Sequence, residues 1–150
     1  NPEAYGGWQR DSEREVDIVT GCFLMIDRSL WERLGGFDPT FFMYAEEADL
    51  CLRASKLGFR PAVTPAAEII HLGGRSEASP VEKTIKTTRG RVTLIRKHWP
   101  AWQRTVGLAL FRGWALSRAL GSHIAHDRRG GSSDKWKTIW GRRSEWLKGY

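Results

Sequence analysis

Cysteine is scarce in this sequence: Cys22 and Cys51 are the only two among 150 residues. Two thiols cannot build a disulfide framework, and neither has a second cysteine at the spacing of a metal-binding pair. The sequence therefore excludes a disulfide-rich secreted scaffold and a metal site built from cysteines. We expect both cysteines to be small buried apolar side chains in a reducing compartment, which favours a cytoplasmic protein.

Long apolar runs are also absent. No run approaches the roughly 20 residues that a helix needs to cross a bilayer, and the best candidate, 106–120, is interrupted by Arg112 and Arg118. The first seven residues are polar and lack the apolar centre of a secretory signal. The sequence does not begin with Met, and we expect it to be a piece of a longer protein.

Acidic residues are rare in the second part of the chain. Residues 81–150 carry 4 Asp and Glu against 16 Lys and Arg, whereas residues 1–80 carry 13 acidic against 8 basic residues. Six of the eight Trp residues lie after residue 98. We therefore expect two parts with different partners, an acidic part over 1–80 and a basic, Trp-rich part over 81–150.

Short apolar and alternating runs predict a sheet in the first part. The expected strands are 16–20, 23–26, 61–64 and 67–71. A short helix is expected over 30–34, with Ser29 as its N-cap and Gly35-Gly36 at its end.

The clearest helix of this part spans 46–57. Acidic residues occupy its first turn and Gly58 follows its end. Leu50, Ala54 and Leu57 are spaced to form one buried stripe. After residue 80 the pattern is helical, with helices expected over 81–98, 101–124 and 134–148 and a flexible loop over 127–133.

Three carboxylates, Glu46, Glu47 and Asp49, occur within four positions at a helix start. One interpretation is charge that complements the helix dipole, which contributes about 0.3–1 kcal/mol per charge. The other is acid/base chemistry, because burial beside the aromatic run 41–44 would raise the pKa of a carboxyl group toward the range of a general base. Asp49 and Arg53 are four apart and predict an ion pair, which leaves Glu46 and Glu47 as the acid/base candidates.

Five segments of this part resemble the family-2 glycosyltransferases of the GT-A fold, specifically a bacterial rhamnosyltransferase-like branch. They follow the family's order and spacing and are 19–26, 35–42, 46–53, 58–59 and 71–76. The resemblance covers the acceptor-side half, whereas the basic part matches only in being helical and cationic. It implies an α/β chain (an α+β fragment), the C-terminal part of a GT-A nucleotide-sugar transferase followed by basic helices.

The resemblance implies an inverting transfer with a carboxylate base. In the family's Glu-Asp-x-Asp pattern the second position supplies the base, and that position is Glu47 here, between Glu46 and Asp49. The acceptor hydroxyl loses its proton while it attacks the anomeric carbon opposite the departing nucleoside diphosphate. A positioned base contributes typically about 10²–10⁴-fold to such a step. Glu in place of Asp keeps this chemistry and carries the carboxylate farther from the backbone.

The resemblance also implies ligands for a metal and for substrates. His71 matches a family histidine that helps to hold a divalent metal, Mn²⁺ or Mg²⁺, although a lone His at a strand end is more often structural. Arg75 and Ser76, within Gly73-Gly74-Arg75-Ser76, suit a diphosphate or a plain flexible loop. The residues expected along the substrate pocket are Thr20, Gly21, Cys22, Gly36, Phe37 and Asp38, for which an architectural role stays open.

No Asp-x-Asp metal motif occurs in the sequence. The family carries this motif in a nucleotide-binding half that precedes the segments seen here. We expect that half, with most metal ligands, to lie outside this chain, and the chain alone to be inactive. The alternative is a protein that has lost donor binding.

The basic part permits three interpretations. The first is an amphipathic surface on an anionic membrane, with Leu108, Phe111, Ala115, Leu116, Trp102 and Trp114 on one side of a helix and Arg104, Arg112 and Arg118 along its border. The second is ordinary helix packing with a solvated basic face. Nucleic-acid binding is the third, and we consider it unlikely.

Together these observations predict a glycosyltransferase fragment. It would transfer a sugar from a nucleotide-sugar donor to a saccharide or lipid-linked acceptor in cell-surface (cell wall) polysaccharide synthesis. The expected location is cytoplasmic, peripheral on the inner face of the plasma membrane. The alternative is a non-catalytic basic helical module that binds a membrane surface or nucleic acid.

Overall fold

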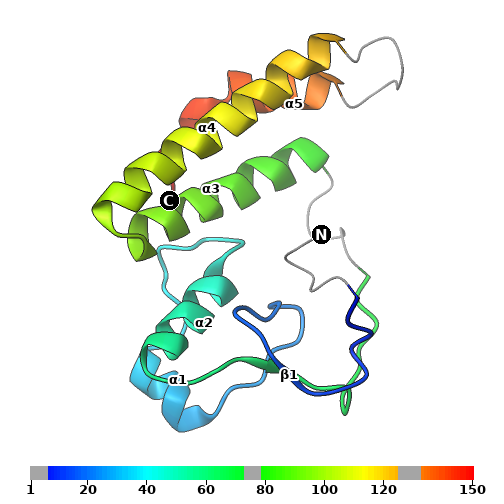
Figure 1. Cartoon of the computed structure of the whole chain (residues 1–150), viewed down its shortest axis with the longest axis vertical. Helices are drawn as coiled ribbons and strands as arrows, with labels where there is room; N and C mark the ends of the chain where they lie inside the picture. Colours follow the sequence, from blue (N-terminus) through cyan, green and yellow to red (C-terminus); the bar gives the residue numbers. More distant parts are fainter. Residues whose placement is uncertain (1–6, 73–78, 125–132) are drawn as a thin grey trace. The chain divides into compact units, whose positions relative to one another are not determined.

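A computed structural model of the chain describes residues 7–72, 79–124 and 133–150 (Figure 1). These residues form five α-helices, one short 3₁₀ helix and a two-stranded antiparallel sheet. The expected mixture of helices and strands is confirmed in this coarse form. The chain divides into two compact units, one of residues 1–38 and 46–72 and one of residues 39–45 and 73–150.

The sheet of the first unit is small. Strand β1 (Arg14–Glu15) pairs antiparallel with β2 (Ala62–Val63), Arg14 lying opposite Val63. The strand expected over 61–64 is therefore confirmed at its centre. The strands expected over 16–20, 23–26 and 67–71 are wrong for the described residues, because a strand needs a neighbour whose backbone groups pair with its own.

Helix α1 (Arg28–Leu34) begins two residues earlier than the sequence predicts. Asp27 is its N-cap and accepts the N–H of Leu30 at 3.1 Å, while Ser29, the expected cap, donates its hydroxyl to Asp27. Gly35 ends the helix with φ 71°, a left-handed conformation that glycine adopts without steric cost.

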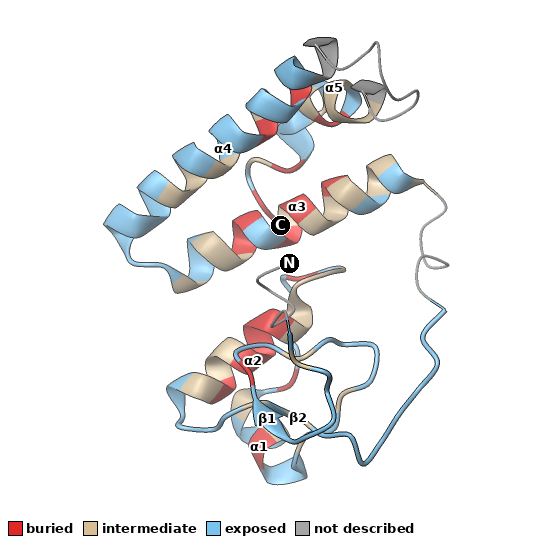
Figure 2. Cartoon of the chain, turned by 45° about the vertical axis from the view of Figure 1, so that its right-hand side comes forward, coloured by how far each residue is buried: buried red, intermediate tan, exposed pale blue. Residues whose placement is uncertain are grey.

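Helix α2 (Glu46–Lys56) confirms the clearest helix prediction. It buries Ala48, Leu50, Cys51 and Ala54, and this side forms the core of the first unit (Figure 2). Leu57 follows the end of the helix and is half exposed, so the predicted stripe is correct for Leu50 and Ala54 and wrong for Leu57.

The second unit is a helical bundle. Helix α3 (Pro80–His98) starts at the N-cap Ser79, and α4 (Ala101–Ile124) follows it after one tight turn. Helix α5 (Ser133–Gly141) and the 3₁₀ helix η2 (Arg143–Glu145) replace the single helix expected over 134–148. Most of the loop expected over 127–133 lies outside the described residues.

The bundle has its own aromatic-rich core. Its fully buried members include Ile139 and Trp146, and the Trp146 indole N–H donates to the carbonyl oxygen of Ile139 at 2.9 Å. Ile85, Val92 and Ala115 complete the buried cluster, with Leu108, Phe111, Trp136 and Trp140 packed around it. Much of the Trp content after residue 98 therefore stabilises this bundle.

Residues 39–45, which precede α2 in the sequence, belong to the unit of the basic helices. The hydroxyl of Tyr150 donates to the carbonyl oxygen of Met43 at 2.7 Å, and the Lys97 ammonium lies 5.6 Å from the centre of the Phe41 ring. A Cβ added to Gly90 of α3 would lie 2.5 Å from the carbonyl oxygen of Tyr44. Helix α3 and the C-terminal residues thus hold this segment closely.

Candidate functional site

The carboxylate cluster at the start of α2 contains one structural ion pair. Asp49 is fully buried, and its Oδ2 accepts the Arg53 Nε–H at 2.7 Å, which confirms the predicted pair. The two terminal nitrogens of Arg53 donate to the carbonyl oxygens of Leu34 at 2.7 Å and of Gly36 at 2.8 Å. Asp49 and Arg53 therefore fix α2 against the end of α1.

Gly36 and Phe37 lie in the turn that Arg53 holds. Gly36 is buried with φ 71°, and a Cβ at this position would lie 2.9 Å from Cζ2 of Trp31. The Phe37 ring meets the Trp31 ring edge-on at 5.1 Å between centroids. The structure thus shows a packing role for these two predicted pocket residues. Asp38, the third, is partly buried in the same turn.

Glu47 and the predicted substrate segment 20–22 are brought together. A Cβ built on Gly21 would lie 3.5 Å from Cβ and 3.7 Å from the carboxyl carbon of Glu47, so the Gly21 backbone lies directly against this side chain. Thr20 and Cys22 on either side are exposed, and the Thr20 hydroxyl lies 3.6 Å from the Cys22 sulfur. The Gly21 backbone, which carries no side chain, therefore lies beside Glu47.

Glu46 and Glu47 are both partly buried, and in each the Oε2 atom is shielded from solvent. For Glu46 Oε2, no hydrogen-bond donor lies within reach among the residues that the structure describes. A buried carboxylate oxygen normally has a partner, because leaving it without one costs about 1–3 kcal/mol. The arrangement suits a group that accepts a proton or a hydrogen bond from a ligand.

Cys51 lies one helical turn after Glu47 and faces the core. Burial raises the pKa of its thiol, a backbone hydrogen bond from Val19 lowers it, and the nearby Glu47 carboxylate raises it again. The expectation of a buried, neutral thiol is confirmed for Cys51 and wrong for Cys22, which is exposed. In the apolar run that follows Cys22, only Leu24 and Ile26 are partly buried, and Cys22 itself lies before them on the exposed surface.

A cavity of about 210 Å³ lies behind α2 in the first unit. Val19, Leu50 and Cys51 are among its lining residues, and Glu46 and Glu47 are not. This cavity is therefore not the predicted acceptor pocket.

His71 is exposed in an irregular segment of the first unit. Across residues 7–72, 79–124 and 133–150, no group of three or more His, Cys, Asp or Glu side chains could hold a metal ion. The described residues thus do not form a divalent-metal site. His71 could contribute one ligand at most to a metal held by other residues. Arg75 and Ser76 lie outside the described residues.

Two features of this region carry no clear signal in the sequence. Tyr44 and Ala45, the last residues before α2, have φ 67° and 78°, conformations that cost of order 1–3 kcal/mol each in non-glycine residues. The second is Gly90, whose packing against Tyr44 depends on a contact far apart in the sequence. Such strained positions concentrate at functional sites and persist where neighbouring packing holds them.

Comparison with known proteins relates the chain to glycosyltransferases. It is 36% identical over 117 residues to the N-acetylglucosaminyl-diphospho-decaprenol L-rhamnosyltransferase of Mycobacterium tuberculosis, a match over 75% of this chain and 36% of the relative. It is 37% identical over 75 residues to the rhamnosyltransferase WbbL of Escherichia coli, covering 50% of this chain and 28% of that protein. These matches confirm a family-2 glycosyltransferase-like relationship.

A third relative extends the relationship to glycan biosynthesis more generally. The low-salt glycan biosynthesis hexosyltransferase Agl10 of Haloferax volcanii is 33% identical over 58 residues, 39% of this chain and 19% of Agl10. The chain thus spans about a third or less of the length of these curated relatives. No family model matches the chain, and no solved structure gives a significant match.

Proposed function

We propose that the chain is the acceptor-side part of an inverting glycosyltransferase, with Glu47 as the general base. Its relatives named as rhamnosyltransferases and a hexosyltransferase support sugar transfer in glycan biosynthesis. The observation that carries the assignment of the base is the contact between Glu47 and the Gly21 backbone. An acceptor hydroxyl can approach the carboxylate there without meeting a side chain from residue 21.

In this proposal the members of the carboxylate cluster have different tasks. Glu47 removes the proton of the acceptor hydroxyl as the oxygen attacks the anomeric carbon and the nucleoside diphosphate leaves. Glu46 accepts a hydrogen bond from the acceptor. Asp49 positions α2 through Arg53 and takes no part in proton transfer.

We also propose the GT-A fold for the protein as a whole. The irregular segments 16–26 and 67–71 support it, because they expose apolar side chains such as Met25 and Ile70 that the neighbours in a larger sheet would cover. Arg75 and Ser76 of this chain would then contact the diphosphate. The rest of donor binding and the binding of a divalent metal would depend mainly on residues outside this chain. The described residues do not form a site for such a metal.

The acceptor is proposed to be a saccharide or a lipid-linked saccharide. The M. tuberculosis relative is named for a decaprenol-linked acceptor, and an enzyme with such an acceptor works at a membrane surface. A peripheral place on the inner face of the plasma membrane follows as part of the proposal. The described residues contain no helix long and apolar enough to cross a membrane.

The test is a transfer assay with the protein encoded by the complete reading frame. Nucleotide-sugars, with nucleoside-diphosphate L-rhamnose first, are offered with lipid-diphosphate-linked N-acetylglucosamine, and the product is analysed by NMR. We expect transfer with inversion at the anomeric carbon. Retention of configuration would contradict the single-base mechanism, and failure with every donor while the protein binds membranes or nucleic acid would favour the non-catalytic alternative.

A further inference from the structure

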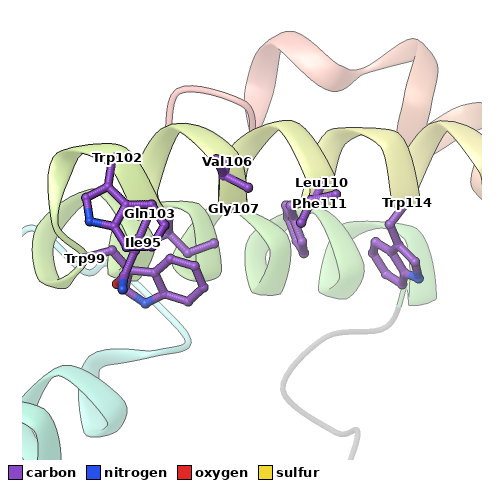
Figure 3. Close-up of a pocket in the computed structure, with 9 residues that line it drawn as sticks. All are labelled: Ile95, Trp99, Trp102, Gln103, Val106, Gly107, Leu110, Phe111 and Trp114. Carbon is purple, nitrogen blue, oxygen red and sulfur yellow. The ribbon is translucent and has the colours of Figure 1, made fainter.

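An apolar groove runs along α3 and α4 in the second unit. Its volume is about 450 Å³, and its lining side chains are almost entirely hydrocarbon and indole (Figure 3). Ile95 and Trp99 line it from the end of α3, while Trp102, Val106 and Leu110 line it from α4. Gln103 is the one amide side chain among the lining residues.

The side of α4 that borders this groove is largely exposed, and Phe111 is the lining residue that also packs against the core of the bundle. Trp102, Val106, Leu110 and Trp114 are each four residues apart and so follow one another along one side of the helix. Trp102 is 70% exposed, Val106 52% and Leu110 69%. Leu108 and Ala115, on the opposite side, pack inward.

This exposed apolar face differs from the one that the sequence predicts. Leu108 and Ala115 were expected to lie on the same side as Trp102 and Trp114, but they pack in the bundle core, whereas Phe111 lines the groove with the two Trp residues as expected. Val106 and Leu110 replace them on the outer face. Helix α4 is therefore apolar on two sides, and core packing explains only one.

Lys and Arg dominate the charges of the two helices that line the groove. Helix α4 contains no acidic residue, and over 80–124 the only acid is Glu82 against nine Lys and Arg. Glu82 itself pairs with Arg142. Arg96 and Arg104 adjoin the lining residues Ile95 and Gln103 in sequence, and the Arg104 guanidinium donates to the Arg96 carbonyl oxygen at 3.3 Å.

We propose that the exposed face of α4 docks on the surface of an anionic lipid bilayer. Trp102, Val106 and Leu110 would lie at the boundary between headgroups and acyl chains, with indole rings at the headgroup level. The surplus of cations on the bundle, 16 Lys and Arg against 4 Asp and Glu over 81–150, would draw it to the anionic lipid. The helix lies in the plane of the interface and does not cross it.

Charge and lining chemistry favour this occupant over two others. A nucleic acid requires cations along the groove that tracks its backbone, whereas this groove is lined by Ile, Val, Leu and Trp. A second copy of the chain would bring two strongly basic surfaces together, which like-charge repulsion opposes. An anionic bilayer would bind both the apolar face and the strongly basic bundle that carries it.

The test is sedimentation of the chain with vesicles of phosphatidylglycerol and phosphatidylcholine, with phosphatidylcholine alone for comparison. We expect strong binding to the anionic vesicles and quenching of Trp emission by lipids brominated near the headgroup. Val106→Glu together with Leu110→Glu should weaken binding at least about tenfold, because the apolar insertion is lost. Raising the salt concentration should weaken it as well, because screening reduces the attraction between the basic bundle and the anionic lipid. Both Glu substitutions are at exposed positions, and circular dichroism checks that the helices persist.

Ile70→Glu is the matched control, because Ile70 is 91% exposed in the other unit, and it should leave binding unchanged. Equal binding of wild type and the double Glu variant would overturn the proposal. So would an oligonucleotide that displaces the chain from vesicles, or self-association abolished by the same double variant. The assay needs no sugar donor, so its failure leaves the proposed glycosyl transfer standing.

Discussion

At the scale of single residues, the ion pair of Arg53 and Asp49 differs from ordinary surface pairs. The Asp49 carboxylate is fully buried, and the Arg53 side chain is only 20% exposed. Arg53 also satisfies two carbonyl oxygens at the end of α1. Removing one partner of a buried pair leaves the other charge uncompensated, which is far more costly than losing an exposed pair.

Arg53→Gln should therefore lower the free energy of unfolding by about 3 kcal/mol or more. Arg28→Gln is the matched control, since Arg28 and Glu32 form an exposed pair at 2.9 Å and such pairs contribute about 0–1 kcal/mol. Urea denaturation of both variants measures the difference. Similar losses in the two variants would contradict the role given to Arg53.

The two thiols should differ in reactivity. Cys22 is exposed and Cys51 is buried with a raised pKa, so a disulfide reagent at neutral pH should modify Cys22 quickly and Cys51 only after unfolding. Because the folded state holds the Cys51 proton more tightly, the contribution of this group to stability is complete at neutral pH. It is lost as the pH rises through the ordinary thiol pKa of 9.0 and above. Rapid modification of both thiols in the folded protein would show that Cys51 is accessible.

Among the helices, α3 packs closely against the segment 39–45. Gly90 lets the helix approach the backbone of Tyr44, and Tyr150 donates to Met43 in the same segment. This segment leads directly into Glu46 and Glu47 in the sequence. Residues 39–45 and the basic helices are thus parts of one structural unit.

Gly90→Ala should destabilise the protein by roughly 1–3 kcal/mol, because the new Cβ would lie 2.5 Å from a backbone oxygen. Gly113→Ala in α4 is the control, since nothing lies within 4 Å of its Cβ position. Alanine there should stabilise the helix by about 0.5–1 kcal/mol. Thermal unfolding of the two variants compares them, and the same sign in both would contradict the packing of Gly90.

The helices could be predicted from the sequence more reliably than the strands. Helix α2 and helices α3 and α4 follow from local signals, namely acidic first turns, a Pro after an N-cap and periodic apolar residues. Whether 16–20 and 23–26 form strands could not be predicted from the local sequence, because strand pairing depends on neighbours distant in the chain. The contact of Gly21 with Glu47 and the left-handed Tyr44 and Ala45 likewise depend on tertiary packing.

At the scale of the whole molecule, the chain carries the acid/base candidates and a basic bundle without a metal site among its described residues. It should therefore bind Mn²⁺ only weakly, since His71 leaves most coordination positions to water. Calorimetric titration of the chain with Mn²⁺ measures this. Tight binding that His71→Ala abolishes would show a metal site that the described residues do not reveal.

The proposed glycosyl transfer depends most directly on Glu47 as the general base. Glu47→Gln removes the proton acceptor and keeps the shape of the side chain, whereas Glu46→Gln changes only a neighbouring hydrogen-bond acceptor. In the protein from the complete reading frame, we expect Glu47→Gln to lower kcat by about 10²-fold or more and Glu46→Gln to lower it less, with both variants folded by circular dichroism. The decisive measurement is kcat of the two variants side by side. A larger loss in Glu46→Gln, or full turnover in Glu47→Gln, would contradict Glu47 as the base.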